Sequence, residues 1–125
     1  MANRVIVATL YQGTVNKNTI CLLNVNPCVL EVAPASAGDT IYLIVQLGNF
    51  PAVAGQQAEA TFAFSSGSPF VTAPPSNLPC AIGSVVQVGT INSVKKKVVD
   101  AYTLTVTYNG QTYIEDPKIQ VDPKP

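Results

Sequence analysis

Three acidic residues near the carboxyl end of the chain are the side chains best spaced for chemistry. Glu115, Asp116 and Asp122 include the closest carboxylates in the sequence. Such groups serve general acid–base catalysis in hydrolases, or bind calcium. Adjacent residues of a strand point to opposite faces, which separates Glu115 from Asp116, and no calcium-loop motif surrounds them. We therefore interpret them as solvated charges and rank a small carboxylate-dependent hydrolase last among the candidate functions.

Histidine is absent from all 125 residues. The chain therefore lacks the side chain that most often acts as a general base, a proton shuttle or a transition-metal ligand. It also lacks the Gly-rich phosphate loops and the Ser nucleophile elbow that mark other enzyme classes. These absences predict no catalytic residue, no metal site and no cofactor, so the protein is expected not to be an enzyme.

The cysteines Cys21, Cys28 and Cys80 are odd in number and scattered through the chain. A structural zinc site usually needs four ligands, which three cysteines without histidine do not supply. Two interpretations remain open: a Cys21–Cys28 disulfide across a hairpin, or buried free thiols that behave as small apolar groups. The second is favoured because the residues after Met1 do not form a secretory signal peptide.

Charged side chains are few and balanced, with seven cations, seven anions and 11% of residues charged, where about a quarter is typical. A neutral chain does not provide the cationic face that nucleic-acid binding needs. The run Lys95–Lys97 is interpreted as a solvated turn or a protective strand edge in preference to a contact with an anionic partner. Because so few charges repel copies of the chain only weakly, a homo-oligomer is among the expected partners.

Apolar and polar residues alternate in three segments, which predicts half-buried strands. These segments are Thr40–Leu47, Ala58–Ser65 and Ala101–Tyr108. We expect one all-β domain over residues 1–125, a single antiparallel β-sandwich of about seven to nine strands with residues 122–125 as a frayed tail. Weaker patterns predict further strands at Arg4–Tyr11, Thr19–Asn24, Cys28–Val32, Val85–Ile91 and Ile119–Val121.

The pair Asn109-Gly110 predicts a β-hairpin, because both residues tolerate the positive φ angles of a type I′ turn. The turn places Tyr108 opposite Gln111 and the second strand at Gln111–Glu115. Tyr108 and Tyr113 then share one face. We interpret them as half-buried packing residues in preference to a carbohydrate-binding platform.

The segment Ser65–Cys80 is the candidate partner-binding loop. It contains four prolines, which lower the entropy lost on binding, and long loops often carry binding residues. Phe70 and Leu78 are expected to pin the loop to the body. The alternative, that the loop only crosses between the sheets and Phe70 serves the core, stays open. The candidate binding residues are Ser66, Ser68, Phe70, Thr72 and Asn77.

The segment Ala52–Ala60 has a helical composition, so a helical turn is expected before the next strand. No apolar run approaches the roughly 18 residues that a membrane span needs, and no membrane partner is expected. If Met1 is the native start of the chain, the expected location is the cytoplasm.

Two stretches resemble known β-sandwich families. Val32–Leu43 (VAPASAGDTIYL) resembles the Gly-Asp-Thr segment that leads into a sandwich strand in cupredoxin-like and immunoglobulin-like domains. Tyr102–Val121 (YTLTVTYNGQTYIEDPKIQV) resembles the closing hairpin of small uncharacterised bacterial β-sandwich proteins that end on an Asp-Pro-x-Ile segment. The resemblance implies a Greek-key sandwich. It does not extend to copper, because cupredoxins use two histidines, a cysteine and usually a methionine, so Cys80 is not read as a ligand.

The function favoured by these features is a non-enzymatic β-sandwich that binds or assembles with an unidentified protein or small ligand. The first alternative is a structural subunit of a virion or surface appendage, since low charge and high β content suit packing against copies.

Overall fold

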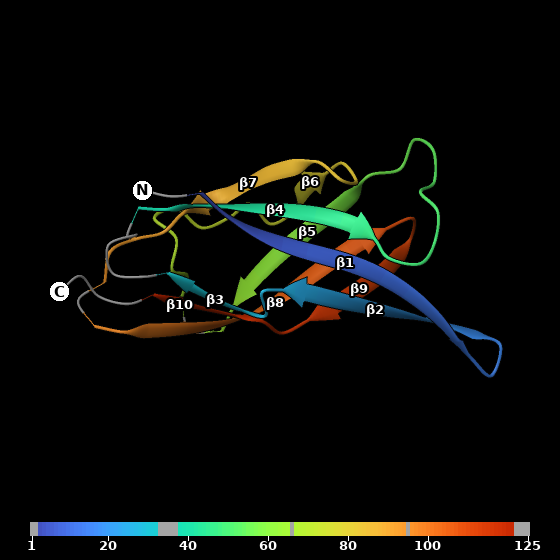
Figure 1. Cartoon of the computed structure of the whole chain (residues 1–125), viewed down its shortest axis with the longest axis horizontal. Coiled ribbons are helices and arrows are strands. Elements are labelled where there is room, and N and C mark those ends of the chain that lie inside the picture. The colour runs from blue at the N-terminus through green and yellow to red at the C-terminus, as the bar shows by residue number, and fades with distance from the viewer. Residues whose placement is uncertain (1–2, 33–37, 66, 95, 122–125) are drawn as a thin grey trace.

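The computed structural model describes residues 3–32, 38–65, 67–94 and 96–121, and every regular element in them is a strand (Figure 1). The predicted all-β class is confirmed, with ten strands where about seven to nine were expected. The strands are β1 (Asn3–Val15), β2 (Asn18–Asn26), β3 (Val29–Val32), β4 (Thr40–Leu47), β5 (Ala58–Phe64), β6 (Leu78–Cys80), β7 (Val85–Thr90), β8 (Val98–Tyr108), β9 (Gln111–Glu115) and β10 (Lys118–Val121).

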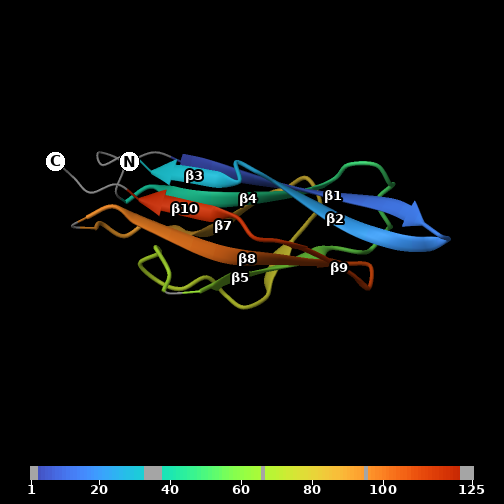
Figure 2. The same ribbon diagram turned by 90° about the horizontal axis from the view of Figure 1, so that it is seen from below.

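The strands form two sheets stacked as a sandwich around one apolar core (Figure 2). The four-stranded sheet has the order β2-β1-β4-β7. The six-stranded sheet has the order β3-β10-β8-β5-β6, and β9 also pairs with β8. Ile6 and Leu43 from the first sheet and Leu104 and Ile119 from the second are fully buried between the layers.

The sheets are mixed, which corrects the expectation of a purely antiparallel sandwich. β1 pairs in parallel with β4, and β3 pairs in parallel with β10. The other pairs of strands are antiparallel. The chain passes between the two sheets at several points, from β2 to β3 and from β3 to β4 among others. Strands that lie far apart in the sequence therefore become neighbours.

The longest strand of the six-stranded sheet, β8, is shared by three partners. One edge pairs with β5, and the other edge takes β10 and then β9 along its length. The chain breaks between β9 and β10 at Pro117, which has no N–H to donate to a ladder. Its carbonyl accepts the N–H of Tyr102 at 3.0 Å.

The predicted hairpin is confirmed with its register. Tyr108 lies opposite Gln111, and β9 has the predicted bounds. Asn109 and Gly110 have φ angles of 49° and 76°, as a type I′ turn requires. The alternation in β4 is confirmed as well, because Ile41, Leu43 and Val45 are buried while the residues between them are half-buried or exposed.

One local prediction is wrong. The segment predicted as a helical turn, Ala52–Ala60, is irregular backbone with a turn at Gly55, followed by the start of β5. A single helical turn gains too few hydrogen bonds to offset its nucleation cost, whereas β5 gains a strand on each side. The predicted loop Ser65–Cys80 ends in a short strand, because Leu78–Cys80 forms β6 against β5.

The predicted tail, residues 122–125, lies outside the described residues. Within the described ranges, no helix is long and apolar enough to cross a membrane.

Candidate functional site

The loop between β5 and β6 is anchored by Phe70, whose side chain is 5% exposed. The Phe70 ring meets Phe64 edge-on, with centroids 5.9 Å apart, and Leu78 is also buried. The expectation that Phe70 and Leu78 pin the loop is confirmed. Phe70 therefore contributes to the core.

The other candidate loop residues do not converge on one point. Ser66 lies outside the described residues, and Ser68 accepts the N–H of Phe70 on its hydroxyl at 3.1 Å. Asn77 is exposed beside β5, where its Oδ1 lies 3.4 Å from Thr61 Oγ1. Thr72 is exposed and lines a groove against β7.

This groove, which we call the β7 groove, encloses about 490 Å³. Pro69–Val71 runs alongside the end of β7 and the residues that follow it. Val71 donates its N–H to the Thr90 carbonyl at 2.8 Å, and Asn92 donates to the Pro69 carbonyl at 2.8 Å. The lining residues are uncharged: Val71, Thr72, Ala73, Pro75, Gln87, Val88, Gly89 and Thr90.

The outward side of the four-stranded sheet carries no charged residue, and we call it the uncharged face. β2, β4 and β7 contain no Asp, Glu, Lys or Arg, and β1 contains only Arg4. Arg4 turns inward and meets the fully buried Asp39, with Nε and Oδ2 2.6 Å apart. Lys17 lies in the turn between β1 and β2, beyond both strands.

Apolar side chains cross the uncharged face in register. Val7, Ile44 and Val85 lie directly opposite one another on β1, β4 and β7. The next row places Val5 beside Tyr42. Val5 is 40% exposed and Val85 is 58% exposed, so the sheet presents a substantial apolar surface to solvent.

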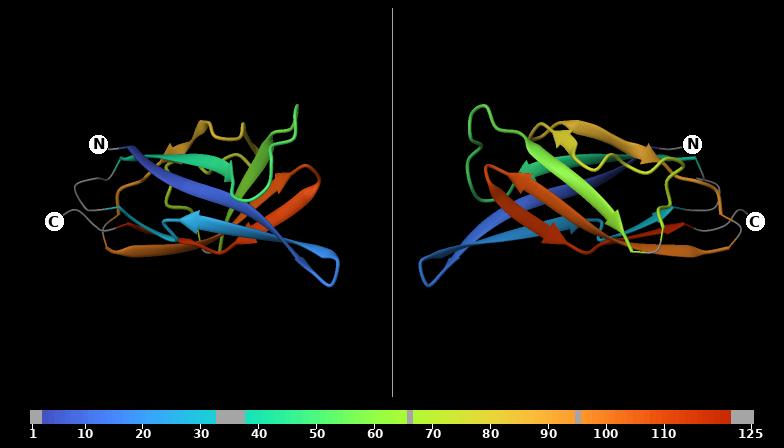
Figure 3. Two further views of the ribbon diagram at one scale, coloured as in Figure 1. Left: turned by 45° about the vertical axis from the view of Figure 1, so that its right-hand side comes forward. Right: turned by 180° about the vertical axis from the view of Figure 1, so that it is seen from behind.

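The β1–β2 hairpin extends this surface as an arm. Its tip reaches past the rest of the sandwich in both views of Figure 3. Val15, Ile20 and Leu22 on the arm are 53%, 37% and 55% exposed. Isolated exposed apolar residues are ordinary, but a contiguous set marks an interaction surface.

The outer side of the six-stranded sheet differs in chemistry. It carries a threonine ladder in which Thr61 lies opposite Thr105, together with the exposed charges Glu31, Glu59 and Lys118. A shallow hollow of about 370 Å³ lies over small residues such as Ala63 and Ala101. The two faces of the sandwich are therefore unequal, and the charges gather on one of them.

The acidic residues of the described ranges do not gather into a group that could hold a metal ion. No three His, Cys, Asp or Glu side chains lie together in those ranges. Asp116 accepts a hydrogen bond from Thr103 Oγ1 at 2.8 Å, and the Asp116 N–H is bonded to Glu115 Oε1 at 2.9 Å. Asp100 is nearly buried on β8, and burial raises the pKa of its carboxyl.

The cysteines are all free, so the alternative of a Cys21–Cys28 disulfide is not formed. Cys80 is buried, and burial raises the pKa of its thiol to about 11. Cys21 is half-buried and Cys28 is exposed, which corrects the expectation that all three thiols are buried. Cys28 is exposed because it lies in the connection between β2 and β3, where only its backbone is held, by the N–H of Lys118 at 2.8 Å.

The paired tyrosines of the hairpin are interior residues. Tyr108 and Tyr113 are 1% and 0% exposed, which excludes them from a surface platform. The Tyr108 hydroxyl accepts the N–H of Val53 at 2.8 Å, and the Tyr113 hydroxyl accepts a hydrogen bond from Gln12 Nε2 at 2.9 Å.

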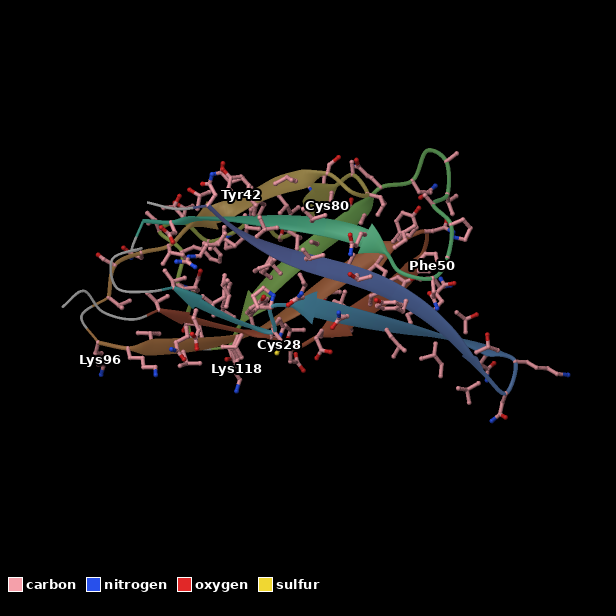
Figure 4. All side chains as sticks on the ribbon, in the orientation of Figure 1. Cys28, Tyr42, Phe50, Cys80, Lys96 and Lys118 are labelled. Atoms are coloured by element: carbon pink, nitrogen blue, oxygen red, sulfur yellow. The ribbon has the colours of Figure 1, made fainter. Side chains whose placement is uncertain are left out.

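Figure 4 shows Lys96 and Lys118 projecting outward, as solvated charges do.

Sequence reasoning placed the candidate site in the Ser65–Cys80 loop, which supplies Thr72 and its neighbours to one wall of the β7 groove. It missed the uncharged face and the wall of the groove that β7 forms. The low charge of the uncharged face could have been predicted from the sequence, because the four predicted strands that form it contain only one charged residue between them. The groove could not be predicted in this way, since it depends on residues 71–75 lying against β7.

Two solved structures show a weak likeness to this chain. The multicopper oxidase Fet3p, which functions in iron import, matches over 100% of this chain at 12% identity with a TM-score of 0.41, and this chain spans 23% of its length. The N-terminal domain of phage TP901-1 ORF48 matches over 100% of both chains at 11% identity with a TM-score of 0.35. No family model and no curated protein matches the sequence.

Proposed function

We propose that this chain is a non-enzymatic assembly module that binds a second copy of itself through the uncharged face. The observation that carries the proposal is the segregation of charge. The outward side of the four-stranded sheet has no charged residue, while Val5, Val85 and the arm residue Leu22 are 40–58% exposed on it.

A second copy is the occupant that fits this chemistry. Two uncharged faces meet without like-charge repulsion and without stripping water from a charge. A charged partner surface, in contrast, would lose hydration and find no counter-charge in the described strands.

The size of the face supports the same occupant. The four strands are 13, 9, 8 and 6 residues long. With strands about 4.8 Å apart and a rise of about 3.3 Å per residue, roughly six to eight residues of each strand cover on the order of 500 Å² in projection. The arm lengthens this area. A standard interface buries about 800 Å² of accessible surface per partner, and side-chain relief makes accessible area larger than projected area.

The test is a charge placed on the face. Val5 lies on β1, inside the sheet order, and is 40% exposed, so Val5→Glu leaves the core untouched. Sedimentation velocity over a concentration series should show that the variant associates at least about tenfold more weakly than the parent protein. The reason is that the new carboxylate loses its hydration at the contact.

The matched control is Val99→Glu, which adds the same charge to the six-stranded sheet at a position 49% exposed. It should associate as the parent does. Equal weakening by both variants would show that added charge acts through net charge and not through the face, which would contradict the proposal.

A structural subunit of a larger assembly is the second candidate, and the projecting arm favours it. An arm that contacts a different patch on the next copy makes a head-to-tail contact, which generates rings or filaments. Masses above that of a dimer, reduced by Leu22→Glu on the arm, would support this candidate over a simple dimer.

A further inference from the structure

Among the residues that the structure describes, the edge of β7 that faces away from β4 is paired at one end only. There, the extended segment Pro69–Val71 lies antiparallel to the end of β7 and the residues after it, with a bridge between Phe70 and Ile91. The hydrogen bonds from Val71 to Thr90 and from Asn92 to Pro69 hold it in place. The chain itself thus adds a short strand to this edge, and the pairing stops at Val71.

The next backbone groups along the edge belong to Gln87. Along an antiparallel pair of strands, opposite residues are alternately hydrogen-bonded and not hydrogen-bonded to each other, and the backbone groups of a non-hydrogen-bonded residue point away from the partner strand. Thr90 lies opposite Thr40 and turns its carbonyl away from β4 toward Val71, so Thr40–Thr90 is a non-bonded pair. Tyr42 is two residues along β4 and lies opposite Gln87 across a bulge. The N–H and C=O of Gln87 therefore also point away from β4.

These outward groups open onto the β7 groove. Gln87 is exposed and lines the groove, and within the described ranges the turn and loop hydrogen bonds do not involve its backbone. The opposite wall supplies apolar contacts from Val71, which is 63% exposed, and from Ala73 and Pro75.

We infer that the β7 groove binds an extended peptide segment of another protein, which continues the strand pairing that Pro69–Val71 begins. Free N–H and C=O groups on a strand edge are matched by the backbone of a further strand, and pockets beside the edge receive alternate side chains. The groove lining is uncharged and partly apolar. The peptide chemistry that fits is an uncharged strand with an apolar side chain at every second position.

This site is separate from the proposed self-association, because it uses the edge of β7 and not the uncharged face. The probe is a capped, dye-labelled peptide of alternating threonine and valine, titrated with the intact protein and followed by fluorescence anisotropy. The control peptide has the same sequence with N-methyl groups on alternate residues, which remove its backbone donors.

The unmodified peptide should bind saturably, and the N-methylated peptide at least about tenfold more weakly, equivalent to about 1.4 kcal/mol. In the protein, Gln87→Pro removes the outward N–H and should weaken binding by a similar factor, while Gln87→Thr keeps the N–H and should bind as the parent does. Val71→Asp gives a second variant at an exposed position, in case Gln87→Pro does not fold, and should weaken binding by placing a charge in the groove.

Three results would overturn the inference. One is no saturable binding of the alternating peptide, and another is equal binding of the N-methylated peptide, which would mean that the edge is not used. The third is a combination of two results, in which Gln87→Pro loses self-association and no peptide binding is seen. That combination would mean that the edge of β7 binds a second copy of the chain. The Val5→Glu variant should still bind the peptide, so failure of the self-association proposal leaves this test intact.

Discussion

The ring of Phe70 occupies the space that a side chain at Gly89 would need. A Cβ built on Gly89 would lie 2.9 Å from Phe70 Cδ1, closer than carbon atoms approach without displacement. This contact fixes the candidate loop to β7, because Phe70 lies at the bridge that pairs the loop with Ile91. Gly89 is therefore required by the position of Phe70.

The Phe70–Gly89 contact predicts that Gly89→Ala destabilises the fold by about 1–3 kcal/mol, as overpacking of a filled core does. Urea denaturation measures the loss. The double variant Phe70→Leu with Gly89→Ala should lose less than the sum of the two single variants, because the smaller side chain relieves the clash. Additive losses would show that the two residues do not compete for space.

Tyr102 has a buried hydroxyl without a hydrogen-bond partner in the described part of the chain. The ring itself is well packed, with centroids 5.4 Å from Phe62 and 5.2 Å from Phe64. Because an unpaired buried hydroxyl costs desolvation energy, Tyr102→Phe should raise the free energy of unfolding by about 1 kcal/mol.

The control for this substitution is Tyr108→Phe in an equally buried residue, whose hydroxyl does accept a hydrogen bond, from the Val53 N–H. That change should lower the free energy of unfolding by about 1 kcal/mol. Destabilisation by both substitutions would mean that the Tyr102 hydroxyl has a partner in the folded protein.

The hairpin turn gives a third prediction. Gly110 has φ 76° and no heavy atom within 4 Å of a built Cβ, so the cost of a side chain there is purely conformational. Gly110→Val should destabilise by about 1–3 kcal/mol in thermal or urea unfolding. Gly13→Val adds the same side chain in open space without a positive φ and should leave stability within about 0.5 kcal/mol.

The sequence was a good guide where structure depends on neighbouring residues. Burial in β4 and β8 follows a period of two, so Ile41, Leu43 and Leu104 could be assigned to the core from alternation alone. The Asn109-Gly110 pair defined its own turn and register, because the positive φ angles are a local property.

Prediction failed where structure depends on contacts between distant residues. The parallel pair β1–β4 joins Arg4 to Ile41 in register, and no local pattern states which strands become neighbours. The loop prediction identified Phe70 as an anchor but not the groove, because the groove exists only once Val71 lies against Thr90. Predicting the uncharged face would have required both the alternation of residues and the knowledge of which strands share a sheet.

Asp100 gives a prediction about pH. Burial raises the pKa of its carboxyl, whereas the unfolded chain titrates near the ordinary value of about 3.9. The folded state therefore holds this proton more tightly, and the contribution of Asp100 to stability falls as pH rises through and above about 3.9. Asp100→Asn should be more stable than the parent near neutral pH, with the difference shrinking toward pH values below the unfolded pKa.

Glu59→Gln is the control for Asp100, because it makes the same carboxylate-to-amide change at an exposed position on the same sheet and should change stability little. Unfolding free energies measured at neutral and acidic pH give the comparison. A neutral-pH loss of stability in Asp100→Asn would show that the carboxylate has a stabilising partner and would contradict the burial argument.

The most direct test of self-association through the uncharged face is sedimentation velocity of the unmodified protein over a wide concentration range, set beside Val5→Glu and Val99→Glu. The segregation of charge onto one sheet predicts a mass that rises with concentration above that of a single chain. The rise should be lost in Val5→Glu and kept in Val99→Glu. A single-chain mass for the unmodified protein at every concentration up to the millimolar range would contradict the proposal.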